Sequence, residues 1–192
     1  MNLIFDFGGV LIDWDPHHLY DPYFGERAKT DWFLRNICTM DWNLQMDGGK
    51  PFAEGVAELT ALHPEWAKEI SMFFTDWIKM VGGPIPGMLE FVQEMKAAEH
   101  GVYGLSNWST ETFPLIKDDY PVLRLLDGIV VSGYEGVVKP QPEIYELLLR
   151  RFSLRASECV FIDDNPVNVA GAEAVGIRGI RFTSLEALRT AL

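Results

Sequence analysis

Short, continuously apolar runs alternate with helix-like segments in the second half of the chain, and this alternation limits the fold more than any other feature. The apolar runs lie at 102–105, 129–132, 160–162 and 177–182. The helix-like segments lie at 88–99, 109–117, 142–152, 166–175 and from 185 onward. Strands that are apolar throughout are buried on both faces, which is typical of a parallel sheet covered by helices. The pattern predicts an α/β fold with three layers, α/β/α.

The first strand is predicted at the start of the chain, where an apolar run from Asn2 to Phe7 ends at Gly8-Gly9. The run has no basic residues before it and carries an acid at position 6, so we expect a strand and not a signal peptide.

An all-helical insertion is predicted between this strand and the rest of the sheet. Five of the six tryptophans lie before residue 80, and apolar residues recur at helical spacing from Trp66 to Ile78. A linker signal, residues 82–87, is rich in glycine and proline and marks the return to the sheet. The expected division is a core of residues 1–15 and 81–192 with a helical cap of residues 16–80. Most cap tryptophans are expected to pack internally, although Trp14 or Trp42 could line a substrate pocket.

Charge and composition exclude several classes of protein. The formal net charge of the 192 residues is -12, which argues against broad binding of nucleic acid or of an anionic membrane surface. No apolar run reaches the roughly 18 residues that a membrane helix needs. The two cysteines, Cys38 and Cys159, have no metal-ligand spacing and are expected to be buried thiols in a reducing compartment. We therefore expect a cytoplasmic protein, either monomeric or weakly homodimeric.

Carboxylates follow two of the predicted strands. Asp6 follows the first, and Asp163 and Asp164 follow the run at 160–162. Ligands of parallel α/β sheets bind beyond the carboxyl ends of the strands, so these acids should meet. Two charges about 4 Å apart repel by roughly 4 kcal/mol at an effective dielectric of 20. A divalent cation with oxygen ligands relieves this repulsion, and Mg²⁺ fits the ligand set better than zinc. The alternative is that the acidic pair only caps the helix predicted to begin at Pro166.

Groups that favour an anion are expected at the same edge. Ser106 and Asn107 precede the predicted helix at 109–117, whose N-terminus would attract a phosphate. Lys139 lies in a turn before Pro140 and could supply a positive charge or simply be solvated. Gly8 and Gly9 could let backbone amides approach a phosphate, or could serve only as a tight turn.

Taken together, these segments resemble the four motifs of the haloacid dehalogenase-like hydrolase superfamily. The segments are Asp6-Phe7-Gly8-Gly9-Val10, Leu105-Ser106-Asn107, Lys139 to Tyr145, and Phe161 to Asn165. The resemblance extends over essentially the whole chain and implies a Rossmann-like core with an α-helical cap.

The resemblance also implies a role for each matching residue. Asp6 would be the nucleophile that forms an aspartyl-phosphate, and Ser106 and Lys139 would stabilise the transferring phosphoryl group. Asp6, the backbone carbonyl of Gly8 and the pair Asp163-Asp164 would hold Mg²⁺. The implied activity is a Mg²⁺-dependent phosphatase acting on a small phosphorylated metabolite, with a sugar phosphate favoured.

One position departs from the superfamily pattern. Most phosphatases of the superfamily have a second aspartate, the general acid and base, where this chain has Gly8. General acid–base catalysis typically contributes about 10² to 10⁴-fold. Either another acid takes the place of this second aspartate, with Asp13 and Asp15 as candidates, or the substrate has an easy leaving group, as a sugar 1-phosphate does.

Two other functions stay open at the level of sequence. A protein that kept the pocket but lost turnover would be a phosphometabolite-binding module. A 2-haloacid dehalogenase is the other alternative, but it would need no metal, which leaves the pair Asp163-Asp164 without a role, and the chain has no aromatic residue at position 8.

Overall fold

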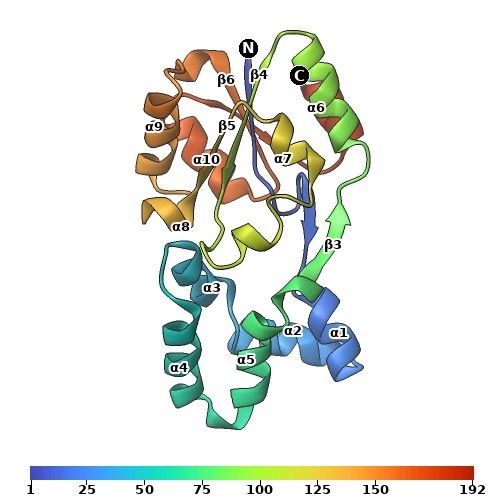
Figure 1. Ribbon diagram of the computed structural model, residues 1–192, viewed down its shortest axis with the longest axis vertical. Helices are drawn as coiled ribbons and strands as arrows, with labels where there is room; N and C mark the ends of the chain where they lie inside the picture. Colours follow the sequence, from blue (N-terminus) through green and yellow to red (C-terminus); the bar gives the residue numbers. More distant parts are fainter.

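The structure is a computed structural model that describes all 192 residues, and its centre is a five-stranded parallel sheet. The strand order is β5-β4-β1-β6-β7. Figure 1 labels three of these strands, β4, β5 and β6, in the upper half of the molecule. The strands are β1 (Asn2–Phe5), β4 (Gly101–Ser106), β5 (Gly128–Val131), β6 (Cys159–Asp163) and β7 (Arg178–Arg181). The middle strand, β1, pairs with β4 and β6 in the same register along its whole length. The carboxyl ends of these three strands therefore lie side by side, and the predicted α/β fold is confirmed.

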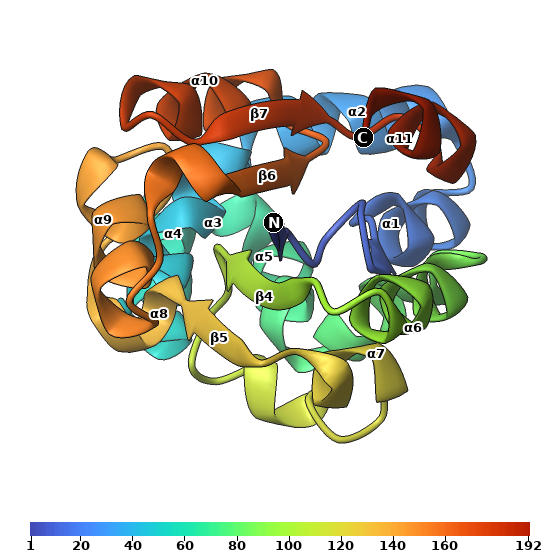
Figure 2. The same cartoon turned by 90° about the horizontal axis from the view of Figure 1, so that it is seen from above.

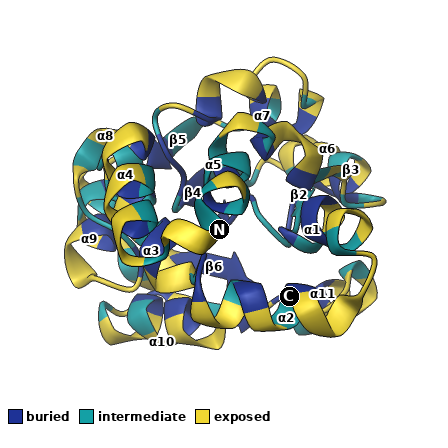
Figure 3. Ribbon diagram, turned by 90° about the horizontal axis from the view of Figure 1, so that it is seen from below, coloured by how far each residue is buried: buried dark blue, intermediate teal, exposed yellow.

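Helices cover both faces of the sheet, because its strands are apolar on both sides. Leu3 and Phe5 of β1 pack into one apolar cluster, whereas Ile4 between them packs into a second cluster. Figure 2 shows α6 and α11 on one side and α8 and α9 on the other. The helices around the sheet, including these four, are α6 (Met88–Ala97), α7 (Pro121–Leu125), α8 (Ser132–Glu135), α9 (Pro142–Arg151), α10 (Pro166–Ala174) and α11 (Leu185–Ala191). Their outward surfaces are exposed, whereas β4 and β6 between them are largely buried (Figure 3).

The segment between the first strand and the rest of the sheet is helical and gathers at one end of the molecule (Figure 1). Its helices are α1 (His17–Phe24), α2 (Arg27–Asn36), α3 (Met40–Asp47), α4 (Phe52–Leu62) and α5 (Ala67–Thr75). Aromatic side chains hold them together: the rings of Tyr20 and Phe33 are 4.9 Å apart, and those of Trp42 and Phe73 are 5.1 Å apart. The helix predicted from Trp66 to Ile78 is shorter than expected and ends at Thr75, with a 3₁₀ turn at each end.

A two-stranded antiparallel ribbon joins the helical segment to the sheet. It consists of β2 (Ile12–Trp14) and β3 (Val81–Pro84), with Asp13 opposite Gly83. The sequence predicted an irregular linker from residue 82, but its first half is a strand. The close approach needs glycine, because a Cβ on Gly82 would lie 2.1 Å from Asp13 Oδ2.

The helix predicted at 109–117 does not form. Ser109 Oγ accepts a hydrogen bond from the backbone amide of Glu111, which favours a local turn over a helix. Pro114 has no amide proton, and the segment contains only a 3₁₀ turn, Phe113–Leu115. The helix N-terminus that we expected to favour an anion after Ser106 and Asn107 is therefore absent, whereas binding of phosphate by these two residues stays a prediction. None of the helices in the structure has both the length and the apolar character needed to cross a membrane.

Candidate active site

The predicted site residues come together at the carboxyl edge of the sheet. Asp6 follows β1, Ser106 ends β4, Asp163 ends β6, and Lys139 lies in the loop before α9. A cavity of about 480 Å³ opens there. The residues predicted for the site that line this cavity are Asp6, Gly8, Gly9, Ser106, Asn107, Lys139 and Asp164.

Asp6 receives several hydrogen bonds on one carboxylate oxygen. Its Oδ1 accepts from Ser106 Oγ at 2.8 Å and from the backbone amide of Phe7 at 2.7 Å, and it lies 2.9 Å from Lys139 Nζ. Burial raises the pKa of Asp6, and the Lys139 ammonium lowers it in turn. The bonds on Oδ1 fix the carboxylate and leave Oδ2 for other contacts.

Lys139 is a buried cation held by two acids. Its Nζ lies 2.7 Å from Asp163 Oδ2 and 2.9 Å from Asp6 Oδ1, and the residue is 1% exposed. Burial alone would lower the pKa of Lys139, but the two carboxylates outweigh it and raise the pKa above its usual value. Its side chain therefore stays charged.

Asn107 fixes the backbone from which this lysine extends. Asn107 Oδ1 accepts from the amide of Lys139 at 2.8 Å, and Asn107 Nδ2 donates to the carbonyl of Lys139 at 3.0 Å. We predicted Asn107 as a phosphate-binding residue. In the structure its side-chain amide binds the Lys139 backbone while the residue also lines the cavity.

Asp163 and Asp164 are adjacent in sequence but differ in their surroundings. Asp163 is fully buried, and its oxygens accept hydrogen bonds from Lys139, Asn168 and the amide of Asn165. Asp164 lines the cavity. The alternative role of the pair as a helix cap does not hold, because α10 is capped by Asn165, whose side chain accepts from the amide of Val167.

The acids form a cluster suited to a cation. One carboxylate oxygen from each of Asp6, Asp163 and Asp164 lies within 4.8 Å of the others. Lys139 is the one lysine bonded to these carboxylates, and Arg181 adds a second positive charge nearby, because its Nε donates to the backbone carbonyl of Asp164 at 3.2 Å. The three carboxylates still outnumber the two cations. Burial, followed by the charge of Asp163, raises the pKa of Asp164, as expected for carboxylates crowded together. A donor set made only of oxygens fits Mg²⁺.

Gly9 lets Asp164 approach the loop after β1. Its φ is 73°, in the left-handed region, and a Cβ placed there would lie 2.7 Å from Asp164 Oδ2. Gly8 differs, because its φ is not positive and a Cβ there would meet only Trp14 Cβ, at 3.9 Å. The structure therefore has room for a side chain at position 8.

Asp13 and Asp15, the two predicted proton donors, do not line the cavity. Asp13 Oδ2 lies 2.9 Å from His18 Nε2, and Asp15 Oδ1 accepts from the amide of His17 at 2.8 Å. Both acids lie in the segment that enters the helical region, and their carboxylates bind the start of α1.

Several residues that line the cavity were not identified from the sequence. They include Asn43, Asp47, Trp77 and Trp108. The first three belong to the helical segment, where the pattern showed only apolar spacing and no motif. Of the two tryptophans considered for the pocket, Trp14 lines it, whereas Trp42 packs on Phe73 and donates from Nε1 to the carbonyl of Gly55.

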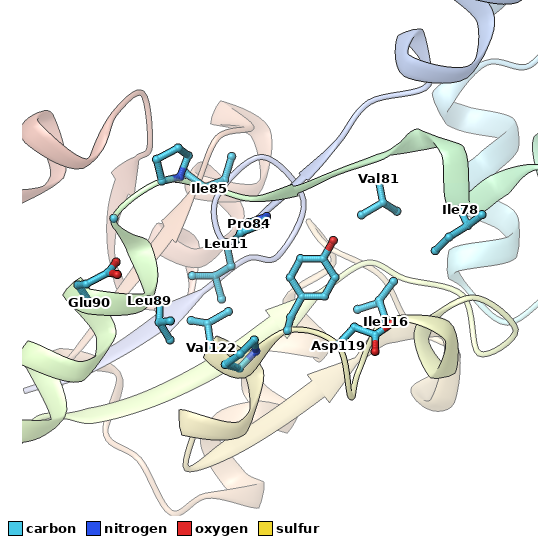
Figure 4. Close-up of a pocket in the computed structure, with 14 residues that line it drawn as sticks. Leu11, Ile78, Val81, Pro84, Ile85, Leu89, Glu90, Ile116, Asp119 and Val122 are labelled. Atoms are coloured by element: carbon cyan, nitrogen blue, oxygen red, sulfur yellow. The ribbon is translucent and has the colours of Figure 1, made fainter.

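A second cavity, of about 660 Å³, is larger but contains none of the predicted site residues. It lies beside the β2–β3 ribbon, and Figure 4 shows Leu11, Ile85 and Val122 pointing into it. Its polar residues Glu90 and Asp119 lie near its edges (Figure 4). The smaller cavity is the candidate active site, because it is the one in which the predicted side chains are grouped.

Phosphatases are among the known proteins that the chain resembles over most of its length. Sesquiterpene phosphatase of Aspergillus oryzae is 28% identical over 186 residues, which cover 94% of this chain and 88% of the relative. D-ribitol-5-phosphate phosphatase of Bacteroides thetaiotaomicron is 25% identical over 185 residues, covering 91% and 88%. A structure of a family enzyme from the same bacterium, in complex with magnesium and inorganic phosphate, aligns with a TM-score of 0.72 at 21% identity and covers 96% of this chain and 94% of that one.

The sequence profile of haloacid dehalogenase-like hydrolases matches residues 1–176. This span includes all four motifs and every residue that we predicted for the site. The chain belongs to the haloacid dehalogenase-like hydrolase family.

Proposed function

We propose that the protein is a Mg²⁺-dependent phosphatase that hydrolyses a small phosphorylated metabolite through an aspartyl-phosphate on Asp6. The observation that carries the proposal is the set of contacts around Asp6: a hydroxyl and an ammonium on one oxygen, with two further acids beside it. The phosphatase names of two relatives that match nearly the whole chain support it.

The side chains divide the reaction between them. A carboxylate oxygen of Asp6 attacks phosphorus, and Lys139 and Ser106 stabilise the negative charge on the phosphoryl oxygens and on Asp6. Asp163 holds the lysine in place, and Asn107 fixes its backbone. Water then hydrolyses the aspartyl-phosphate and regenerates the carboxylate of Asp6.

Asp6 and Asp164, with the carbonyl of Gly8, would hold the Mg²⁺ directly. Asp163 would contribute mainly through Lys139, because its oxygens already accept three hydrogen bonds. When bound, the cation supplies positive charge that reduces the repulsion between the phosphate and the carboxylates.

We further propose the division of the chain into a core, residues 1–15 and 81–192, and a cap, residues 16–80. The cavity supports this division, because core residues such as Asp6 and Lys139 line it together with residues of α3 such as Asp47. The chain enters the cap through strand β2 and returns through strand β3, and these two strands would be the hinge of the cap.

A hydroxylated substrate, such as a sugar phosphate, fits the cavity. Polar side chains such as Asn43 and Thr112 line it together with the aromatic surface of Trp14. Pockets of this kind bind small ligands through a few polar groups that fix their orientation. The relative named for D-ribitol 5-phosphate acts on a substrate of this class.

The two alternatives explain the site less well. A 2-haloacid dehalogenase has no need for a metal, and the cluster of three acids would stay without a function. The family description does not separate the two activities, so the separation rests on these acids. A binding module without turnover would not need a nucleophile fixed by a hydroxyl, an amide and an ammonium.

The proposal is tested with p-nitrophenyl phosphate and a panel of phosphorylated metabolites. We expect hydrolysis that requires Mg²⁺, stops with a chelator and is lost in Asp6→Asn. Glu54→Gln, which removes an exposed acid on α4 outside the cavity, is the matched control and should keep full activity. Absence of hydrolysis across the panel by wild-type protein with Mg²⁺ would favour the binding module. Hydrolysis of 2-haloacids that survives the chelator would favour the dehalogenase.

A further inference from the structure

Asp47, an acid of the helical segment, lines the same cavity as Asp6 and Lys139. It is the last residue of α3, immediately before Gly48-Gly49. The side chain therefore enters the site from the end of a helix, opposite the strand edge that carries the nucleophile. No sequence motif marks this residue.

The Asp47 side chain is held in one orientation. Asn43, one turn earlier in α3 and 4% exposed, donates from Nδ2 to Asp47 Oδ2 at 2.9 Å. Asn43 is the one side chain bonded to the Asp47 carboxylate, and the backbone amide of Ser109 also stabilises its charged form. The protein thus fixes the orientation of the Asp47 carboxyl at the lining of the cavity.

The helix end itself is tied to the core. Ser132 Oγ, at the start of α8, donates to the carbonyl of Asp47 at 2.5 Å and accepts from the amide of Trp108 at 3.0 Å. These bonds connect α3 with the loop that follows β4, the strand that ends in Ser106. The position of the Asp47 carboxyl relative to the phosphate pocket is therefore set by hydrogen bonds between the helical segment and the sheet.

The surroundings of Asp47 favour a protonated fraction near neutral pH. Burial raises the pKa of Asp47 to about 7, while the charge of Lys139 and the amide of Ser109 lower it. The C-terminal end of a helix is also the negative end of its dipole and disfavours a carboxylate. Asp6 and Asp164 are the other acids that line the cavity close to the phosphate pocket, and Asp41 lies one and a half turns earlier on the same helix.

We propose that Asp47 is the general acid and base of this phosphatase, in place of the aspartate that position 8 lacks. The inference rests on the proposed function. Compared with Asp13 and Asp15, which bind the start of α1, Asp47 is the acid that both lines the cavity and is positioned by buried partners.

The proton moves with each of the two bond changes. As an Asp6 oxygen bonds to phosphorus, the bond from phosphorus to the substrate oxygen breaks, and the proton of the Asp47 carboxyl passes to that oxygen to give an alcohol. The Asp47 carboxylate then takes a proton from the water that attacks the aspartyl-phosphate. Inorganic phosphate leaves, and Asp6 is again a carboxylate and Asp47 a carboxylic acid.

The test compares leaving groups in wild-type protein and Asp47→Asn. Asparagine keeps the size of the side chain and an oxygen that accepts from Asn43, but it has no acidic proton. Hydrolysis of an alkyl phosphate such as glycerol 3-phosphate should fall by about 10² to 10⁴-fold, because the alkoxide needs protonation. The comparison uses kcat/KM, which reports only the formation of the aspartyl-phosphate, because loss of the base in the later hydrolysis step slows both substrates equally. The kcat/KM of p-nitrophenyl phosphate, whose leaving group needs little protonation, should fall by less than about tenfold.

A second variant separates a catalytic role from a structural one. Position 8 has room for a side chain, so Gly8→Asp in the Asp47→Asn background should restore part of the alkyl phosphatase activity. Asp13→Asn, Asp15→Asn and the surface control Glu54→Gln should keep the wild-type ratio of the two substrates. Thermal melting of each variant confirms that the proteins are folded.

The outcomes distinguish this inference from the proposed function. If wild-type protein hydrolyses phosphate esters but the kcat/KM of Asp47→Asn falls equally for both substrates, or for neither, Asp47 is not the general acid. If Asp13→Asn or Asp15→Asn gives the selective loss of alkyl phosphates, that residue is the acid. If wild-type protein and Gly8→Asp hydrolyse no phosphate ester at all, the proposed function itself is wrong.

Discussion

Gly9 offers the sharpest test of the metal site, because its backbone and its neighbour Asp164 constrain it separately. Its φ of 73° lies in the left-handed region, and a Cβ would lie 2.7 Å from Asp164 Oδ2 and 2.9 Å from Asp164 Cγ. The change Gly9→Ala therefore has two effects. One strains the backbone and acts on stability, and the other displaces a proposed metal ligand and acts on Mg²⁺ binding.

The two effects differ in size and in readout. A non-glycine residue in the left-handed region is unfavourable by roughly 1 to 2 kcal/mol, which lowers the free energy of unfolding. Restoring an ordinary contact requires the Asp164 carboxylate to move by roughly 0.7 Å, and displacements of about 1 Å in an active site cost about 100-fold in rate. We therefore expect Mg²⁺ affinity to fall by about tenfold or more.

The control is Gly25→Ala, at the end of α1. Gly25 has a similar φ of 69°, but a Cβ there would have no heavy atom within 4 Å. Urea unfolding should show a comparable loss of stability in both variants, whereas calorimetric titration should show weaker Mg²⁺ binding in Gly9→Ala alone. Equal Mg²⁺ affinity in Gly9→Ala and wild-type protein would refute the assignment of Asp164 as a ligand held against Gly9.

Further variants test other parts of the structure. Asp164→Asn should weaken Mg²⁺ binding and phosphatase activity together, which titration and a rate assay measure; unchanged metal affinity would contradict its role. Asn107→Ala removes both hydrogen bonds to the Lys139 backbone and should lower the free energy of unfolding in urea by about 1 to 3 kcal/mol, with loss of activity; a stable, fully active variant would show that the bonds are dispensable. Partial burial lowers the pKa of His17, but hydrogen bonds to two aspartates outweigh it and raise the pKa above 6.5. These bonds therefore stabilise the folded protein fully below about pH 6.5, and they stabilise it less as the pH rises through the raised pKa of His17. The difference in melting temperature between wild-type protein and His17→Gln should then shrink from pH 5.5 to pH 8.5. A difference that grows with pH would contradict this reasoning.

The sheet could be predicted because its strands carry their own signal. Successive apolar residues, as at 160–162, favour burial on both faces, which is typical of a parallel sheet covered by helices. The helix at 109–117 failed for a local reason: Ser109 and Pro114 favour turns, and apolar spacing does not register such effects. Strand β2 was missed because three residues are too few to show the alternation of apolar and polar residues that marks a strand. Its partner β3 contains two glycines, which in the sequence indicated a linker.

The site could be predicted as far as its motif residues, and no further. Asp6, Ser106 and the acidic pair lie at the ends of strands or directly after them, so the parallel topology was enough to bring them together. Lys139 joins them from the loop between α8 and α9. Asp163 and Asp164 have different surroundings because their side chains point in different directions at the end of the strand. Two identical residues in a row do not show from the sequence which of them points into the core. Asp47 came from a helix whose orientation over the sheet is set by tertiary contacts such as the bond from Ser132.

The β2–β3 ribbon has a consequence for how such a chain can change over evolution. Because Trp14 pairs with Val81, the chain leaves the sheet and returns to it at neighbouring points. Topologically, residues 15–80 occupy the place of a hairpin loop. The entropy of closing a loop grows only logarithmically with its length, so replacing a two-residue turn by these helices adds only about 3 kcal/mol to closure. The helical segment can thus be lengthened, shortened or exchanged for another while Asp6, Lys139 and the acidic pair keep their positions at the edge of the sheet, so the lining of the cavity can change without rebuilding that edge.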